Sequence, residues 1–263
     1  GRTLIRLIPA TDGHVYLDGE DISGLKGKAL KQMRKKAQII FQDPSACLNP
    51  RRTVRQILME PFQIHHMTGS MDIDARIEEL LHLVGLDTYH LSRYPHELSG
   101  GQKQRIGIAR ALIMEPEFVV ADEPISALDV SIRAQVLNLL NQLKASRGLT
   151  YLFIAHDLSV VRFISDRIAV IYKGRIVELA EAEELFHHPL HPYTKALLSA
   201  VPIPDPEIEK KKKLLIYDPT LHDYTISKPQ WVEITEGHFV YGNEPELEKY
   251  RAEIEAINAA ERA

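Results

Sequence analysis

The chain has little cysteine, no surplus of positive charge and no long apolar run. Its single cysteine, Cys47, excludes an internal disulfide framework and fits a reducing, cytosolic setting. The net charge of -4 lacks the surplus of Lys and Arg that binds phosphate backbones, so we expect no nucleic-acid partner. No apolar run approaches the roughly 18 residues that a membrane-spanning helix needs.

These 263 residues also contain no P-loop, the phosphate-binding motif Gly-x-x-x-x-Gly-Lys-Ser/Thr. Gly27-Lys28 comes nearest to it. However, Ala29 follows without a hydroxyl for magnesium, and Ile22 stands where the first glycine of the motif belongs. The sequence starts without a methionine, inside a run over residues 1–8 that has helical spacing. We therefore expect an N-terminally incomplete protein.

The composition that remains is that of an ordinary globular chain of one large or two smaller domains, with 44% hydrophobic and 26% charged residues. Two Asp-Gly pairs bracket residues 14–17, which predicts a short strand in an antiparallel meander with tight turns. Residues 37–42 predict another strand. From residue 43 to about 97 the pattern indicates a helical subdomain inserted between strands. Its helix breakers are Pro50, Pro61 and Gly69.

The clearest pattern is a strand-helix-strand unit. Residues 117–124 and 150–157 are apolar strands, and residues 130–146 between them predict an amphipathic helix. Such a unit has parallel strands buried on both faces, and its active groups belong at the carboxyl ends of the strands. Both strands do end in ionisable residues, which are Asp122 and Glu123 in the first and His156 and Asp157 in the second.

These strand ends have a chemical and a structural interpretation. An Asp at the position of Asp122 is typical of the residue that holds magnesium in P-loop nucleotidases. Glu123 would then accept a proton from an attacking water, and His156 would hydrogen-bond a γ-phosphate. The structural alternative is that each residue caps the loop after its strand. For each of these residues taken alone, the structural alternative is the commoner of the two.

A second anion site is predicted within residues 93–112, RYPHELSGGQKQRIGIARAL. Ser99, Gly100, Gly101 and Gln102 stand just ahead of a stretch with helical spacing. The two glycines let the backbone approach a ligand closely, and the free N–H groups and positive dipole end of the helix favour a phosphate.

Five motifs follow one another in a fixed order: Gln42 at the end of a strand, LSGGQ at 98–102, FVVADE at 118–123, SALD at 126–129 and IAHD at 154–157. This set resembles the ATP-binding cassette of ABC transporters over about residues 1–180. The resemblance implies an α/β fold, a P-loop NTPase-type ABC cassette with a mostly parallel sheet. It also implies a small antiparallel β-subdomain and an inserted helical subdomain at about residues 43–110.

The resemblance assigns a role to each motif. Asp122 binds magnesium, Glu123 is the catalytic base and His156 contacts the γ-phosphate. Gln42 lies at the nucleotide and its metal, and couples the cassette to the membrane subunits. The remaining cofactor-binding residues face the partner's ATP or line the dimer seam, and they are Ser99, Gly100, Gly101, Gln102 and Asp129. For Asp129, the N-cap of a helix from Val130 is a compatible structural alternative.

The cofactors that the resemblance implies are ATP and Mg²⁺. The implied partners are a second cassette, identical or paralogous, two transmembrane permease subunits and, indirectly, an extracytoplasmic peptide-binding protein. The chain would work at the cytoplasmic face of the cell membrane. The family's Walker A loop would precede residue 1, so we expect these 263 residues alone to bind Mg-ATP weakly and to be inactive.

Residues 181–263 are expected to be a C-terminal extension. Residues 185–206 and 39–54 are similar to oligopeptide and dipeptide importer ATPases, but residues 207–263 lack the cysteine cluster of many relatives, which excludes an iron–sulfur site. For His187, His188 and His191 we expect a solvated turn rather than a metal site. Residues 209–215 predict a solvated linker rather than a lipid patch, and residues 244–263 predict a charged, frayed helix.

Two other classes of function stay open. A non-transport ABC-type ATPase would be expected to carry tandem cassettes or long coiled-coil insertions, and neither appears in the sequence. A hydrolysis-deficient regulatory protein is disfavoured by Glu123 and His156, although the missing P-loop leaves it possible for these residues alone.

Overall fold

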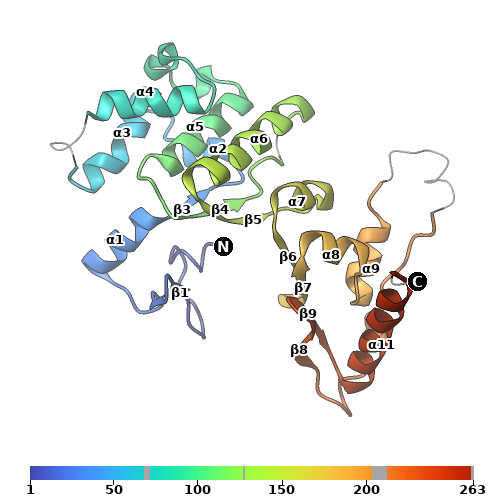
Figure 1. Cartoon of the computed structure of the whole chain (residues 1–263). Helices are drawn as coiled ribbons and strands as arrows, with labels where there is room; N and C mark the ends of the chain where they lie inside the picture. The colour runs from blue at the N-terminus through green and yellow to red at the C-terminus, as the bar shows by residue number, and fades with distance from the viewer. Residues whose placement is uncertain (68–71, 127, 203–211, 262–263) are drawn as a thin grey trace. The chain divides into compact units, whose positions relative to one another are not determined.

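The computed structural model describes residues 1–67, 72–126, 128–202 and 212–261. The chain divides into two compact units, Gly1–His156 and Asp157–Ala263, and each is described by itself. Figure 1 traces the elements of both units along the chain. No helix within the described residues is both long and apolar enough to cross a membrane.

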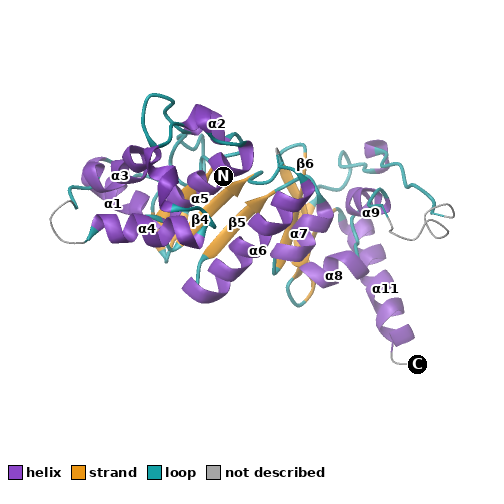
Figure 2. Ribbon diagram, turned by 90° about the horizontal axis from the view of Figure 1, so that it is seen from above, coloured by secondary structure: helices purple, strands orange, loops and turns teal. Residues whose placement is uncertain are grey.

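A three-stranded parallel sheet forms the centre of the first unit. Its strands are β3 (Ala37–Ile40), β4 (Phe118–Asp122) and β5 (Thr150–Ile154), in the order β3-β4-β5. Three consecutive β4 residues, Val119, Val120 and Ala121, are fully buried, as expected for a parallel strand covered on both faces. Figure 2 looks onto this sheet, with helices α5 (Gly100–Leu112) and α6 (Val130–Arg147) beside it. The predicted strand-helix-strand unit is thus confirmed.

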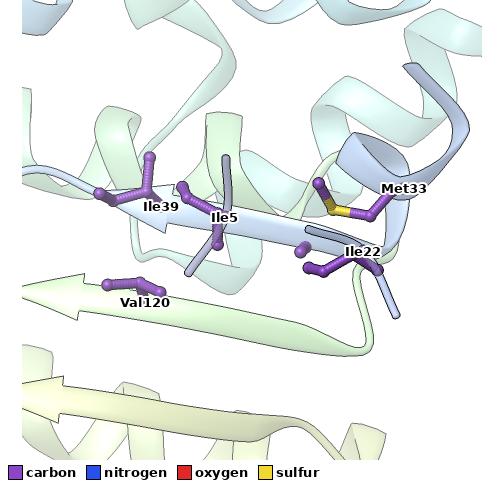
Figure 3. Packing of buried hydrophobic residues seen from close by; sticks show 6 residues of the cluster. Ile5, Ile22, Met33, Ile39 and Val120 are labelled. Atoms are coloured by element: carbon purple, nitrogen blue, oxygen red, sulfur yellow. The ribbon is translucent and has the colours of Figure 1, made fainter. Parts of the chain in front are cut away.

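The N-terminal segment packs on the same sheet. The strand predicted at residues 14–17 is shorter in the structure, where β1 (Tyr16–Leu17) pairs antiparallel with β2 (Glu20–Asp21) and α1 (Gly27–Lys36) follows. Figure 3 shows the apolar cluster in which this segment meets β3 and β4. Its labelled members are Ile5, Ile22, Met33, Ile39 and Val120.

The helical spacing of residues 1–8 was misleading, because residues 2–6 form turns. Arg6 takes the left-handed backbone conformation, with φ at 59°, which an α-helix cannot continue through. Ile5 is nevertheless buried in the apolar cluster. The spacing therefore placed the buried side chain correctly but not the secondary structure.

Helices fill the chain between β3 and β4, as predicted. They are α2 (Pro44–Cys47), α3 (Val54–Ile64), α4 (Ile73–Leu83), the 3₁₀ turns η1 (Thr88–Ser92) and η2 (Pro95–Glu97), and α5. Pro61 does not break α3 as expected, although it lacks the N–H for one helical hydrogen bond. The helix persists because Leu58 and Phe62 beside it are buried. Gly69 lies outside the described residues.

The second unit contains a four-stranded antiparallel sheet. Its strands β6 (Arg167–Tyr172), β7 (Arg175–Glu181), β8 (Gln230–Thr235) and β9 (His238–Gly242) are ordered β6-β7-β9-β8. The other elements of the unit are α7 (Leu158–Ile164), α8 (Ala182–His187), α9 (Pro192–Ser199), η3 (Pro219–Leu221) and α11 (Glu244–Glu261). Because β7 pairs with β9, this sheet joins residues on both sides of the boundary expected at residue 180.

Two expectations for the C-terminal extension were correct only in part. The predicted terminal helix is present as α11, but it is packed rather than frayed, because its Leu247, Tyr250 and Ile254 are buried in an apolar cluster with Val240 of β9. The histidine-rich turn is not fully solvated either. His191 is buried and forms the N-cap of α9, where its ring nitrogen accepts a hydrogen bond from the Tyr193 N–H. Part of the predicted linker, residues 209–211, lies outside the described residues.

Candidate functional site

Three polar side chains that follow the three parallel strands lie together. The Gln42 amide, two residues beyond β3, donates a hydrogen bond of 2.8 Å to the Glu123 carboxylate, one residue beyond β4. His156, two residues beyond β5, has its Nδ1 atom 3.6 Å from the same Glu123 oxygen. The register explains this meeting, since Ile40 pairs with Ala121 and the carboxyl ends of parallel strands share one edge of a sheet.

Solvent reaches the three side chains to different degrees. The Glu123 side chain is 28% exposed, whereas the His156 side chain is 75% exposed. A partly covered carboxylate beside an open imidazole can accept a proton from a small molecule that enters from solvent. The arrangement suits general base chemistry on a polar ligand above the strand ends.

Asp122 is the last residue of β4, in register with Ile154 of β5. Its carboxylate lies 3.6 Å from the Arg2 guanidinium, and its side chain is 22% exposed. By contrast, Asp157 does what the structural alternative describes, because its carboxylate accepts hydrogen bonds from the Ser159 and Val160 N–H groups at the start of α7.

The backbone at Glu123 is in the left-handed region, with φ at 46°. Its N–H donates to the Ile154 carbonyl at 2.9 Å, which continues the β4–β5 ladder by one bond. Its carbonyl accepts bonds from the Ser126 N–H at 3.3 Å and the Ser126 hydroxyl at 3.1 Å. Glu123 is therefore the first residue of a four-residue turn that is closed by hydrogen bonds from Ser126.

The residues of the predicted anion site begin α5. Ser99 is the N-cap and forms a capping box with Gln102, in which the Gln102 N–H donates to the Ser99 hydroxyl and the Ser99 N–H donates to the Gln102 side chain. The Gln102 amide also lies 3.3 Å from the His90 ring. Within the described residues, no hydrogen bond or ion pair connects this helix start to Gln42, Glu123 or His156.

The two glycines of this segment differ. A Cβ atom on Gly101 would come within 2.9 Å of the Ile132 side chain of α6, whereas one on Gly100 would meet nothing within 4 Å. Gly101 is therefore required for the close approach of α5 and α6, whether or not a ligand binds here. Only Gly100 is free of such a structural demand.

Asp129 occupies the N-cap position of α6, but its side chain makes no capping hydrogen bond. Its carbonyl accepts the first helical bond, from the Arg133 N–H at 2.8 Å. The carboxylate is thus exposed and not used in capping the helix. Ala127, within the same motif, lies outside the described residues.

Sequence reasoning missed Arg110, which links two of the motifs. This α5 residue donates a hydrogen bond of 2.5 Å to the Cys47 carbonyl, and its guanidinium lies 6.0 Å from the centre of the Phe41 ring, next to Gln42. The segment that carries Gln42 is thereby attached to the helix that begins at the predicted anion site. The sequence offers no signal for this contact between residues 63 positions apart.

Comparison with known proteins identifies the family. Residues 2–126 match the ABC transporter family, and residues 177–227 match the oligopeptide/dipeptide transporter C-terminal region. The oligopeptide transport ATP-binding protein OppF of Streptococcus pyogenes serotype M1 is 58% identical over 97% of this chain and 83% of its own length. OppF of Bacillus subtilis strain 168 is 54% identical over 95% of this chain and 83% of its own length. The chain belongs to the ABC transporter ATP-binding proteins.

A solved structure supports the same assignment for this ABC protein. The dimeric ATP-binding cassette MJ0796, in a post-hydrolysis state bound to ADP and phosphate, has a TM-score of 0.62 and 31% identity, over 69% of this chain and 78% of that one. The predicted fold class, a P-loop NTPase-type ABC cassette, is thus confirmed. The ABC protein accordingly binds ATP and has the fold of an ATP hydrolase.

Proposed function

We propose that this ABC protein is the ATPase subunit of an importer of oligopeptides or dipeptides, working at the cytoplasmic face of the cell membrane. The observation that carries the catalytic part is the meeting of Gln42, Glu123 and His156 where the parallel strands end. The names of the relatives and the match of residues 177–227 support the peptide part.

In this proposal, Glu123 is the general base. Its carboxylate accepts the proton of the water that attacks the γ-phosphate, while the Gln42 amide holds one carboxylate oxygen at 2.8 Å. The exposed His156 imidazole extends beside the same carboxylate and donates a hydrogen bond to the γ-phosphate. Together these residues orient the water and offset the negative charge that develops during phosphoryl transfer.

The side chains at this edge also fit a magnesium ion. Mg²⁺ takes oxygen ligands, commonly one or two carboxylates together with phosphate oxygens and waters. Asp122 offers a partly exposed carboxylate at the strand end. The Gln42 amide oxygen is available too, because the amide nitrogen makes the bond to Glu123. Bound there, the ion neutralises phosphate charge; Asp122 and Gln42 would hold it.

The same proposal gives the chain its partners. A second cassette, identical or paralogous, places its ATP above the start of α5, where Ser99, Gly100, Gly101 and Gln102 complete that site. The two glycines contribute their N–H groups and the helix its dipole, while the Ser99 and Gln102 N–H groups form the capping box. The exposed Asp129 carboxylate lies at the seam. Two transmembrane permease subunits receive the motion through the helical subdomain near Gln42, and an extracytoplasmic peptide-binding protein delivers the peptide.

The substitution Glu123→Gln tests the assigned base. In the transporter assembled with the full-length protein we expect ATP binding to persist and ATP turnover to fall by at least about 10²-fold, because only the capacity to accept a proton is lost. Glu117→Gln is the matched control, since this exposed carboxylate just before β4 pairs with Lys36. Turnover close to normal in the Glu123→Gln transporter would remove Glu123 from the role of base.

A further inference from the structure

The conformation of Glu123 is unusual for its residue type. Its φ of 46° lies in the left-handed region, which non-glycine residues adopt uncommonly and at a cost. Pro124 follows directly, and a proline also disfavours the right-handed helical conformation for the residue before it. The surrounding structure must therefore hold the backbone of this one residue in place.

Two residues supply the bonds that do so. The Ile154 carbonyl accepts the Glu123 N–H at 2.9 Å. On the other side of the residue, the Glu123 carbonyl accepts the Ser126 N–H at 3.3 Å and the Ser126 hydroxyl at 3.1 Å. Any non-proline residue at 126 would supply the N–H bond, but only serine or threonine supplies a hydroxyl for this carbonyl. The hydroxyl bond is also the shorter of the two.

The backbone conformation at Glu123 decides where its carboxylate points. The direction of the Cα–Cβ bond relative to the sheet changes with φ and ψ, so a change at this corner swings the whole side chain. In the observed conformation the carboxylate lies 2.8 Å from the Gln42 amide and 3.6 Å from His156. A displacement of about 1 Å at a reacting group can cost on the order of 10²-fold in rate.

We propose that Ser126 is a positioning residue for Glu123. Its hydroxyl closes the turn that begins at the Glu123 carbonyl, and this bond keeps the carboxylate aimed at the water that it deprotonates. The inference rests on the proposed function, because it assumes that Glu123 is the base. Ser126 itself touches neither Gln42 nor His156 through any hydrogen bond described for this chain, so its effect passes through Glu123.

The first test compares side chains at position 126 in the assembled transporter. We expect Ser126→Ala to lower kcat for ATP about tenfold while leaving KM for ATP nearly unchanged, because the base is displaced and nucleotide binding is not. Ser126→Thr should keep most of the turnover. Ser126→Val has nearly the shape of Thr without the hydroxyl, and should turn over as slowly as Ser126→Ala.

Ser92→Ala is the matched control. The Ser92 hydroxyl makes the same kind of bond, to the carbonyl three residues earlier, at 3.2 Å from Tyr89 O in η1. We expect its loss to leave kcat unchanged. Equal turnover of the Ser126→Thr and Ser126→Val variants would overturn the proposal. So would a normal kcat for Ser126→Ala, and this second result remains informative if the Val or Thr variant folds poorly.

A double-substitution cycle separates positioning from a general structural role. If Ser126 acts only through Glu123, then Ser126→Ala should cause no further loss of turnover in a Glu123→Gln transporter. The same fold-loss in both backgrounds would contradict the proposal. A Glu123→Gln transporter with nearly normal turnover would instead show that the assignment of the base, and with it the proposed mechanism, is wrong.

Discussion

At the scale of single residues, the site is centred on the Glu123 carboxylate, because the Gln42 amide and the His156 ring both lie beside one of its oxygens. Gln42, Glu123 and His156 could be predicted to meet, because apolar strands are recognisable in the sequence and parallel strands end at one edge. The contacts that hold these residues could not be predicted. The bond from Ser126 depends on a left-handed conformation at Glu123, which no residue pattern announces. The hydrogen bond from Arg110 to the Cys47 carbonyl depends on how α5 packs against that segment.

The packing role of Gly101 could not be predicted from the sequence either, and it leads to a testable prediction. Its replacement by Ala should destabilise the protein by about 1–3 kcal/mol, because the new methyl group meets the stiff, β-branched Ile132 side chain at 2.9 Å. Gly100→Ala, one residue earlier in open space, should not destabilise it. Denaturant unfolding of the full chain measures both.

A second substitution at the same contact checks the cause. Ile132→Ala should restore part of the stability lost in Gly101→Ala, since it removes the atoms that collide. If Gly100→Ala and Gly101→Ala unfold at the same denaturant concentration, the close approach of α5 and α6 is not what requires this glycine.

At the scale of elements, the second unit is joined by a buried charged cluster that the sequence did not reveal. Glu178 of β7 is fully buried and accepts hydrogen bonds from the Leu190 and His191 N–H groups and from the ring of His238 in β9, at 2.7, 3.1 and 2.9 Å. The other ring nitrogen of His238 lies 3.2 Å from Glu184 of α8. One carboxylate thus connects two strands to the turn before α9.

The sequence could indicate strand-like pieces near residue 230, but not their partners. An antiparallel strand pairs through its backbone, and β9 joins β7 across about 60 residues of chain. Parallel strands were easier to identify because their burial on both faces leaves continuous apolar runs.

The buried cluster of Glu178 and His238 predicts a pH dependence of stability. Burial lowers the pKa of His238, but the hydrogen bond and charge of Glu178, helped by Glu184, outweigh it and raise the pKa above the usual 6.5. A raised histidine pKa gives stability that is fully present below about pH 6.5 and is lost as the pH rises through the folded-state value. The free energy of unfolding of the full chain should therefore fall as the pH rises above 6.5.

Two substitutions test that dependence. In His238→Gln the fall above pH 6.5 should be smaller, and His238→Ala should destabilise the chain by about 3–5 kcal/mol, because it leaves the buried Glu178 without its charged partner. The control is His187→Gln, whose exposed ring lies 3.8 Å from Glu183. Identical pH profiles for His238→Gln and the unchanged chain would show that His238 is not the titrating group.

At the scale of the whole molecule, three of the motifs meet within the chain and the LSGGQ motif at 98–102 does not join them. Gln42, Glu123 and His156 lie together within one chain. The start of α5 has no bond to them among the described residues, and in the proposed function it completes the site of a second cassette instead. This division could be expected from the motifs, but not from any single spacing.

Peptide uptake by the reconstituted transporter is the decisive measurement. It uses proteoliposomes that carry the permease subunits and both full-length cassettes, with Mg-ATP inside and a labelled oligopeptide with its binding protein outside. We predict ATP-dependent uptake that Glu123→Gln lowers by at least about 10²-fold and that Glu117→Gln leaves intact. Uptake that proceeds normally with Glu123→Gln, or that does not depend on ATP, would contradict the claim that this chain powers peptide import by hydrolysing ATP at Glu123.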